Sequence, residues 1–211
     1  MLRLLLHVCC GPCAIWPITE LYNLCVTGLF YNPNIHPVEE FAKRLGGVKK
    51  LFTEKGAPLI VCEDYMQDEW EAFEMAGGRN GGEQYLSKIS NLRNLSNISS
   101  LSNLSNIGNI GNISNTGNTG LRCAMCYRVR LSYTAKLAFE LGFDAFSTTL
   151  LISPYQNHEL IAAICVELSS QFSVDFFYRD FRPHFRKGQK LARDAGLYRQ
   201  KYCGCIFSIL Q

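Results

Sequence analysis

The 211-residue sequence predicts a single α/β domain with a mostly parallel, doubly wound sheet flanked by helices and interrupted by a low-complexity insertion. Short apolar runs alternate with segments of helical spacing, which is typical of parallel sheets. Hydrophobic residues make up 47% of the chain, enough for a substantial core. No run reaches the roughly 18 apolar residues of a membrane helix, and the apolar start lacks a signal-peptide pattern, so we expect a cytoplasmic protein.

Three strands and three helices are expected before the insertion. Apolar composition favours strands over residues 2–8, 29–31 and 58–62. Helical spacing favours helices over residues 14–27, 37–55 and 65–76. The turn residues Gly11-Pro12 and Asn32-Pro33-Asn34 end the first two strands.

The same alternation resumes after the insertion. We expect helices over residues 126–141, 159–171 and 186–195, and strands over residues 145–150 and 174–178. In doubly wound sheets, ligands bind beyond the carboxyl ends of the strands. Cys9 and Cys10 lie at that end of the first strand, so we expect chemistry there.

Residues 89–121 depart from this pattern. Asn recurs at nearly every third position, a period that matches neither a helix nor a strand. The segment contains no aromatic residue, and Arg93 is its only charge. We therefore interpret it as an Asn-rich, disordered insertion within one domain that spans residues 1–211.

Ten cysteines are unusual in a chain without an export signal, and clustered cysteines in a reducing compartment are typically metal ligands or redox thiols. Seven fall in three groups: Cys9, Cys10 and Cys13; Cys123 and Cys126; Cys203 and Cys205. Three others, which we expect to be small buried hydrophobic residues, stand alone: Cys25, Cys62 and Cys165.

The first two groups have the spacing of metal ligands. Cys9 and Cys10 can converge only where their strand ends, and Cys13 then falls near a helix start, where unpaired N–H groups favour a thiolate. Cys123 and Cys126 can offer two sulfurs from one turn. Four thiolates complete either a structural zinc site or a [4Fe–4S] cluster, and the spacing fits both.

The third group suggests redox chemistry. A single flexible residue, Gly204, separates Cys203 from Cys205, which favours a strained, redox-active disulfide. Just before this pair, residues 179–201 hold eight Arg or Lys against two Asp. Such a stripe could bind the phosphates of a polyanion, or it could be an ordinary solvated helix face.

Five ordered motifs together resemble the QueH family of epoxyqueuosine reductases. They cover nearly the whole chain apart from the insertion: His7-Val8-Cys9-Cys10-Gly11-Pro12-Cys13, Tyr31-Asn32-Pro33-Asn34-Ile35, Arg122-Cys123-x-x-Cys126-Tyr127, Phe146-Ser147-Thr148-Thr149-Leu150-Leu151-x-Ser153-Pro154 and Tyr198-Arg199-Gln200-x-Tyr202-Cys203-Gly204-Cys205-x-x-Ser208. The resemblance implies a Rossmann-like (HUP-like) fold and the last step of queuosine biosynthesis, the reduction of epoxyqueuosine to queuosine in a tRNA anticodon. It also implies a [4Fe–4S] cluster and an additional mononuclear iron, without cobalamin.

The resemblance also implies roles for individual residues. The cluster ligands would be Cys9, Cys10, Cys123 and Cys126, with Cys13 near the extra iron. The redox-active, catalytic pair would be Cys203 and Cys205. The implied partners are tRNA carrying epoxyqueuosine and an electron donor, with no membrane. Polar candidates for substrate contact are Tyr127, Ser147 and Tyr202, whereas His7 on its apolar strand is expected to be a satisfied core histidine.

Two other classes of protein remain open. One is a zinc-stabilised nucleic-acid-binding module without catalysis, and the other is a general thiol–disulfide oxidoreductase that works without iron. Colour and metal content of the purified protein distinguish the three, because only the reductase contains iron.

Overall fold

The computed structural model describes residues 1–63, 117–205 and 208. The chain divides into two compact units, one of residues 1–65 with 127–211 and one of residues 66–126. The expected helix over residues 65–76 lies outside the described residues. The same holds for the expected insertion, apart from residues 117–121, which form the start of a helix.

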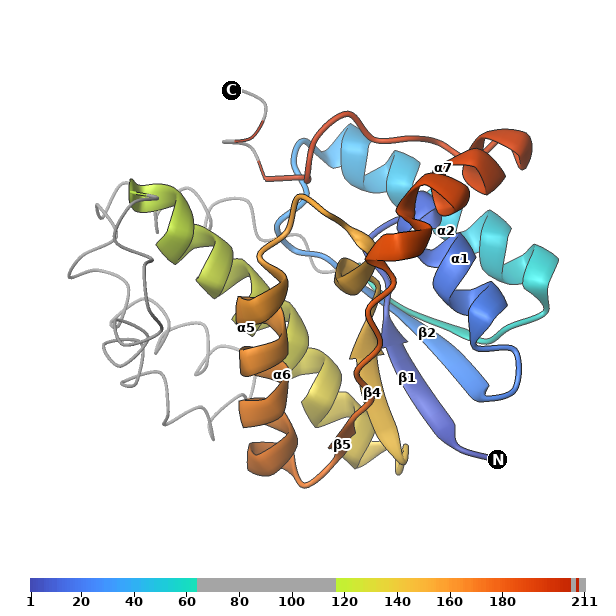
Figure 1. The fold of residues 1–211 in the computed structure, drawn as a ribbon. Helices are drawn as coiled ribbons and strands as arrows, with labels where there is room; N and C mark the ends of the chain where they lie inside the picture. The colour runs from blue at the N-terminus through green and yellow to red at the C-terminus, as the bar shows by residue number, and fades with distance from the viewer. Residues whose placement is uncertain (64–116, 206–207, 209–211) are drawn as a thin grey trace. The chain divides into compact units, whose positions relative to one another are not determined.

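The first unit contains a five-stranded, fully parallel sheet with the order β3-β2-β1-β4-β5 (Figure 1). The central strand carries a continuous apolar run, Leu4, Leu5 and Leu6, which is completely buried, as expected of a strand covered on both faces. The strands are β1 (Arg3–His7), β2 (Cys25–Tyr31), β3 (Leu59–Cys62), β4 (Ala145–Thr148) and β5 (Asp175–Phe176).

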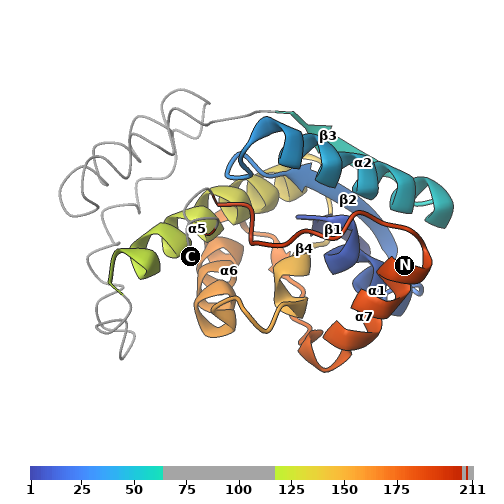
Figure 2. The ribbon, with the colours of Figure 1, turned by 90° about the horizontal axis from the view of Figure 1, so that it is seen from above.

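Helices cover both faces of this sheet (Figures 1 and 2). One face is covered by α1 (Gly11–Glu20) and α2 (Val38–Lys55), and the other by α6 (His158–Phe172) and residues 127–140 of α5 (Gly117–Glu140). Helix α7 (Phe185–Asp194) packs on α1. The predicted α/β, Rossmann-like class is confirmed. Among the helices that the structure describes, none is long and apolar enough to cross a membrane.

The boundary between α1 and β2 differs from the prediction. The helix ends at Glu20, and the strand begins at Cys25, whereas helical spacing alone predicted a helix up to residue 27. Val26 and Thr27 are β-branched and pair with Leu4 and Leu5 of the central strand. Tertiary pairing thus overrides local helical spacing at these residues.

The start of α5 also differs from the prediction. The helix begins at Gly117 instead of residue 126, so Cys123 and Cys126 lie inside the helix and not in a turn before it. Residues three positions apart on a helix occupy the same side, so the pair keeps the arrangement that shared metal binding requires.

The strand order creates a place for a ligand. From β1 the chain runs through α1 to β2 on one side, while β4 lies on the other side of β1. The segments that leave the carboxyl ends of β1 and β4 therefore diverge, which is the topological switch point of an open parallel sheet. Cys9 and Cys10 follow β1 there, and a 3₁₀ helix, η3 (Thr149–Ile152), follows β4.

Candidate metal centre and thiol loop

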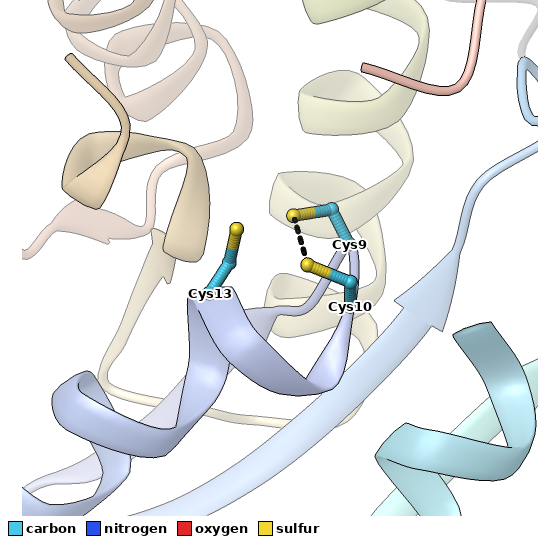
Figure 3. Close-up of side chains that lie close together, drawn as sticks. All are labelled: Cys9, Cys10 and Cys13. Atoms are coloured by element: carbon cyan, nitrogen blue, oxygen red, sulfur yellow. Dashed lines mark hydrogen bonds between the residues drawn. The ribbon is translucent and has the colours of Figure 1, made fainter. Parts of the chain in front are cut away.

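Three cysteine sulfurs gather at the switch point (Figure 3). Cys9 follows β1, Cys10 is the extended N-cap residue of α1, and Cys13 lies in the first turn of that helix. The three Sγ atoms lie within 4.8 Å of one another, and those of Cys9 and Cys10 are 3.8 Å apart. All three side chains are buried. The first predicted cysteine group is thus brought together as one cluster.

Close packing fixes the loop that carries these sulfurs. The buried Asn32 side chain donates a hydrogen bond of 2.8 Å to the carbonyl of Val8, the residue before the cysteines. A Cβ atom on Gly11 would lie 3.2 Å from the carbonyl oxygen of Gly47 in α2, so glycine permits the close approach of α1 to α2. The loop is therefore held by both backbone contacts and a buried amide.

Two polar side chains surround the sulfurs. The Oγ1 atom of Thr149 lies 3.5 Å from the Sγ of Cys9 and accepts a hydrogen bond of 3.3 Å from the Cys9 backbone N–H. The amide Nε2 of Gln200 lies 2.9 Å from the Sγ of Cys10 and 3.6 Å from that of Cys13. Each of the three sulfurs therefore has a polar neighbour from a distant part of the chain.

The sulfurs compete for negative charge. Hydrogen bonds with the Cys10 and Cys13 thiols, together with Thr149, hold the pKa of Cys9 well below its usual range. Burial raises the pKa of Cys10, and hydrogen bonds to the Cys10 and Cys9 sulfurs raise that of Cys13. These neighbours oppose the thiolate that the helix N-terminus favours at Cys13.

The donor set of this cluster fits a thiophilic metal. Two thiolates bound to one tetrahedral ion at about 2.3 Å lie about 3.8 Å apart, which is the spacing of Cys9 and Cys10. A bound cation stabilises thiolates that otherwise repel one another, so metal binding would remove the competition among the three sulfurs.

His7 is a core residue, as expected. It is completely buried at the end of β1, with Nδ1 2.9 Å from the Thr148 hydroxyl and Nε2 3.2 Å from the Tyr31 carbonyl oxygen. A carbonyl only accepts, so Nε2 carries the proton and Nδ1 accepts from Thr148. Burial and the charge of Arg130 lower the pKa of His7 to about 4, which keeps the ring neutral.

The second predicted cysteine pair lies on α5 in the other compact unit. Cys123 and Cys126 are three residues apart on the helix and are both half-buried. The four-cysteine ligand set spans both units and stays a prediction.

The third predicted pair lies in a C-terminal segment that we call the thiol loop, residues 202–205. Cys203 is exposed, and Cys205 is half-buried. Gly204 has φ +110°, and a Cβ there would lie 2.9 Å from Ile35 and 3.0 Å from Arg44. The glycine is therefore required by backbone conformation and by packing.

A buried arginine on α2 holds the thiol loop. Arg44 donates hydrogen bonds of 2.9 and 3.0 Å to the carbonyl oxygens of Tyr202 and Cys203, and one of 2.7 Å to the Glu40 carboxylate. The Tyr198 hydroxyl donates to the other oxygen of Glu40. Sequence reasoning missed Arg44 and Glu40, because a Glu–Arg pair four residues apart on a helix is typical of an exposed surface.

The structure also places the remaining predicted residues, and substrate contact by Tyr127, Ser147 and Tyr202 stays a prediction. The hydroxyls of Tyr127 and Tyr202 donate hydrogen bonds within the fold, to Gln156 and to the His36 carbonyl. Ser147 is completely buried in β4. Among the lone cysteines, Cys165 is buried as expected and Cys62 is half-buried. Cys25 is exposed, contrary to expectation, because it begins β2 at the sheet's amino-terminal edge.

Six of the eight cations of the basic stripe fall into two classes. Arg179 and Arg182 form ion pairs with Glu20 and Asp180. Helix α7 instead buries Gly188 and Ala192 and exposes four cations, none of which forms an ion pair within the described part of the chain: Arg186, Lys187, Lys190 and Arg193. The Nζ of Lys187 lies 4.2 Å from the ring centre of Trp16.

Comparison with known proteins gives a consistent match. The family model described as epoxyqueuosine reductase QueH matches residues 4–84 and 83–211. Relatives with that name include proteins from Dehalococcoides mccartyi (29% identical, 98% of this chain and 92% of the relative), Thermotoga maritima (29%, 98% and 90%) and Acinetobacter baylyi (30%, 98% and 80%). The similarity thus extends over almost the whole chain.

Proposed function

Because the chain belongs to the QueH family of epoxyqueuosine reductases, we propose that it reduces the epoxide of epoxyqueuosine in tRNA to the alkene of queuosine, without cobalamin. The observation that carries this proposal is the buried cluster of Cys9, Cys10 and Cys13 at the switch point of the sheet. That position is where parallel sheets bind their ligands.

The sulfurs of Cys9, Cys10 and Cys13 are suited to hold the metal centre that we propose for this reaction. We assign Cys9, Cys10, Cys123 and Cys126 as ligands of a [4Fe–4S] cluster, and Cys13 to an additional iron beside it. When bound, iron–sulfur centres supply electrons one at a time. The burial of the Cys9, Cys10 and Cys13 sulfurs supports this assignment, because it excludes water from the ligands.

The thiol loop is suited to a two-electron step. Oxidation of the Cys203 and Cys205 thiols to a disulfide forms one S–S bond and releases two electrons and two protons. Reduction of the epoxide consumes the same two electrons and two protons, breaks both C–O bonds, leaves a C=C bond and releases water. An external electron donor then returns the disulfide to two thiols. We propose these cysteines as the catalytic pair.

The exposed cations of α7 are suited to the tRNA backbone. Four exposed positive charges that form no ion pair with any described residue lie on one short helix: Arg186, Lys187, Lys190 and Arg193. Phosphate contacts of this kind dominate nucleic-acid affinity and weaken with salt. We propose that this face binds tRNA.

Anaerobic purification tests the metal assignment. We expect a brown protein that contains iron and sulfide and has a broad absorption at about 400 nm. Replacement of Cys9 or Cys10 by Ala should bleach this absorption, whereas Cys25→Ala, at an exposed lone cysteine, should not. Colourless protein that contains only zinc would instead indicate a zinc-stabilised module.

Turnover of tRNA that carries epoxyqueuosine tests the catalytic pair. Cys203→Ser and Cys205→Ser should keep the cluster and lose multiple-turnover reduction, because they remove one thiol of the pair. Cys25→Ser is the matched control. Full activity in both loop variants would refute the role, and activity of an iron-free preparation would indicate a general thiol–disulfide oxidoreductase.

A further inference from the structure

We propose that Gln200 is a positioning residue for the metal centre. Its side-chain amide donates hydrogen bonds to the ligand sulfurs, which raises the affinity of the site for metal and the reduction potential of the bound centre. This inference rests on the proposed function only in the identity of the metal. The amide nitrogen lies 2.9 Å from the Sγ of Cys10 and 3.6 Å from that of Cys13. One amide thus reaches two of the three sulfurs.

The orientation of the amide follows from the chemistry of the sulfurs. A metal-bound thiolate only accepts hydrogen bonds, so the NH₂ group and not the carbonyl must face it. This orientation leaves the Oε1 of Gln200 buried and without a hydrogen-bond partner among the residues that the structure describes. A buried carbonyl without a partner is unfavourable, so the side chain carries a stability cost that its contact with the sulfurs explains.

The contact also connects two parts of the site. Gln200 lies only three residues before Cys203, and the intervening segment includes Tyr202, whose carbonyl is held by Arg44. The residue therefore contacts the metal-binding sulfurs from the same segment that carries the thiol loop. Hydrogen bonds to ligand sulfurs are among the determinants of iron–sulfur reduction potentials, because they stabilise the more negative, reduced state.

The test compares Gln200→Met with Gln189→Met, a matched change at a half-buried glutamine of α7 that does not contact sulfur. The probe is Co(II) alone, titrated into the metal-free full chain and followed by its thiolate charge-transfer absorption. Loss of a hydrogen-bonding neighbour of a metal ligand typically lowers affinity about 10–100-fold. We expect that loss for Gln200→Met and none for Gln189→Met.

A second readout separates tuning from packing. On the iron-loaded protein, a redox titration should give a more negative midpoint potential for Gln200→Met than for the wild type, with unchanged iron and sulfide content. Should the Met variant fail to fold, Gln200→Glu keeps the shape and replaces the donor by a carboxylate, which also predicts a more negative midpoint potential.

The outcomes are distinguishable from those of the proposed function. Co(II) binding does not require that the native centre be an iron–sulfur cluster. A purified protein that contains only zinc would refute the reductase assignment, but the Co(II) titration would still test the role of Gln200. Equal Co(II) affinity in the wild type and in Gln200→Met would overturn the inference. So would an unchanged midpoint potential in an iron-loaded variant.

Discussion

Replacement of Arg44 by Met should destabilise the protein strongly. Arg44 is 2% exposed, and its three hydrogen bonds go to the Glu40 carboxylate and to two carbonyls of the thiol loop. Met fills much of the same volume but leaves the buried carboxylate without its cation. Removal of one partner of a buried ion pair typically costs about 3–5 kcal/mol, and we expect a loss in that range.

Urea unfolding of the metal-free protein measures this loss. The control is Lys43→Met, because Lys43 is exposed and adjacent in the sequence, and its replacement should change stability by less than about 0.5 kcal/mol. The double variant Arg44→Met with Glu40→Gln should recover at least about 1 kcal/mol, since it removes the uncompensated charge. A loss below about 1 kcal/mol for Arg44→Met would refute the reasoning.

Two further predictions concern the packing of glycines and the stability of an ion pair in acid. A Cβ on Gly28 would lie 2.3 Å from a ring carbon of Phe52, so Gly28→Ala should cost about 1–3 kcal/mol in thermal or urea unfolding. A Cβ on Gly46, which lies in α2, would have no atom within 4 Å, so Gly46→Ala should instead stabilise the protein by about 0.5–1 kcal/mol. Greater stability of Gly28→Ala than of Gly46→Ala would contradict the packing argument. Hydrogen bonds from Arg182 lower the pKa of Asp180 from 3.8 to about 2. The stability that this carboxylate contributes is complete above about pH 4 and is lost as the pH falls toward 2. Asp180→Asn should therefore make the free energy of unfolding less dependent on pH in this range. An unchanged pH dependence would argue against the ion pair.

Local features made much of the fold and part of the site predictable. The apolar run of β1 and the Gly11-Pro12 break after it are contiguous in sequence, and they alone place Cys9 and Cys10 at the end of a buried strand. The same local reasoning extended α1 too far, because the pairing of Val26 with Leu4 is set by the neighbouring strand and not by helical spacing.

The polar neighbours of the sulfurs were not predictable from local pattern. Gln200 and Cys10 are separated by 190 residues, and Arg44 and Tyr202 by 158. A lone glutamine or a helical arginine has the same sequence appearance on a solvated surface as in a buried site. Only the folded chain shows that Gln200 contacts the cysteine sulfurs and that Arg44 holds the thiol loop.

The pairing of β1 with both β2 and β4 has a consequence for the order of folding. His7 contacts Tyr31 across 24 residues but Thr148 across 141. Contacts between residues close in sequence form with less loss of chain entropy, so we expect the β1–β2 half to form first and β4 to dock later. The segment that supplies Thr149 to Cys9 arrives with β4, and Gln200 follows it in the chain. The surroundings of the cysteine sulfurs are therefore completed late, and we expect efficient metal uptake only after β4 has docked.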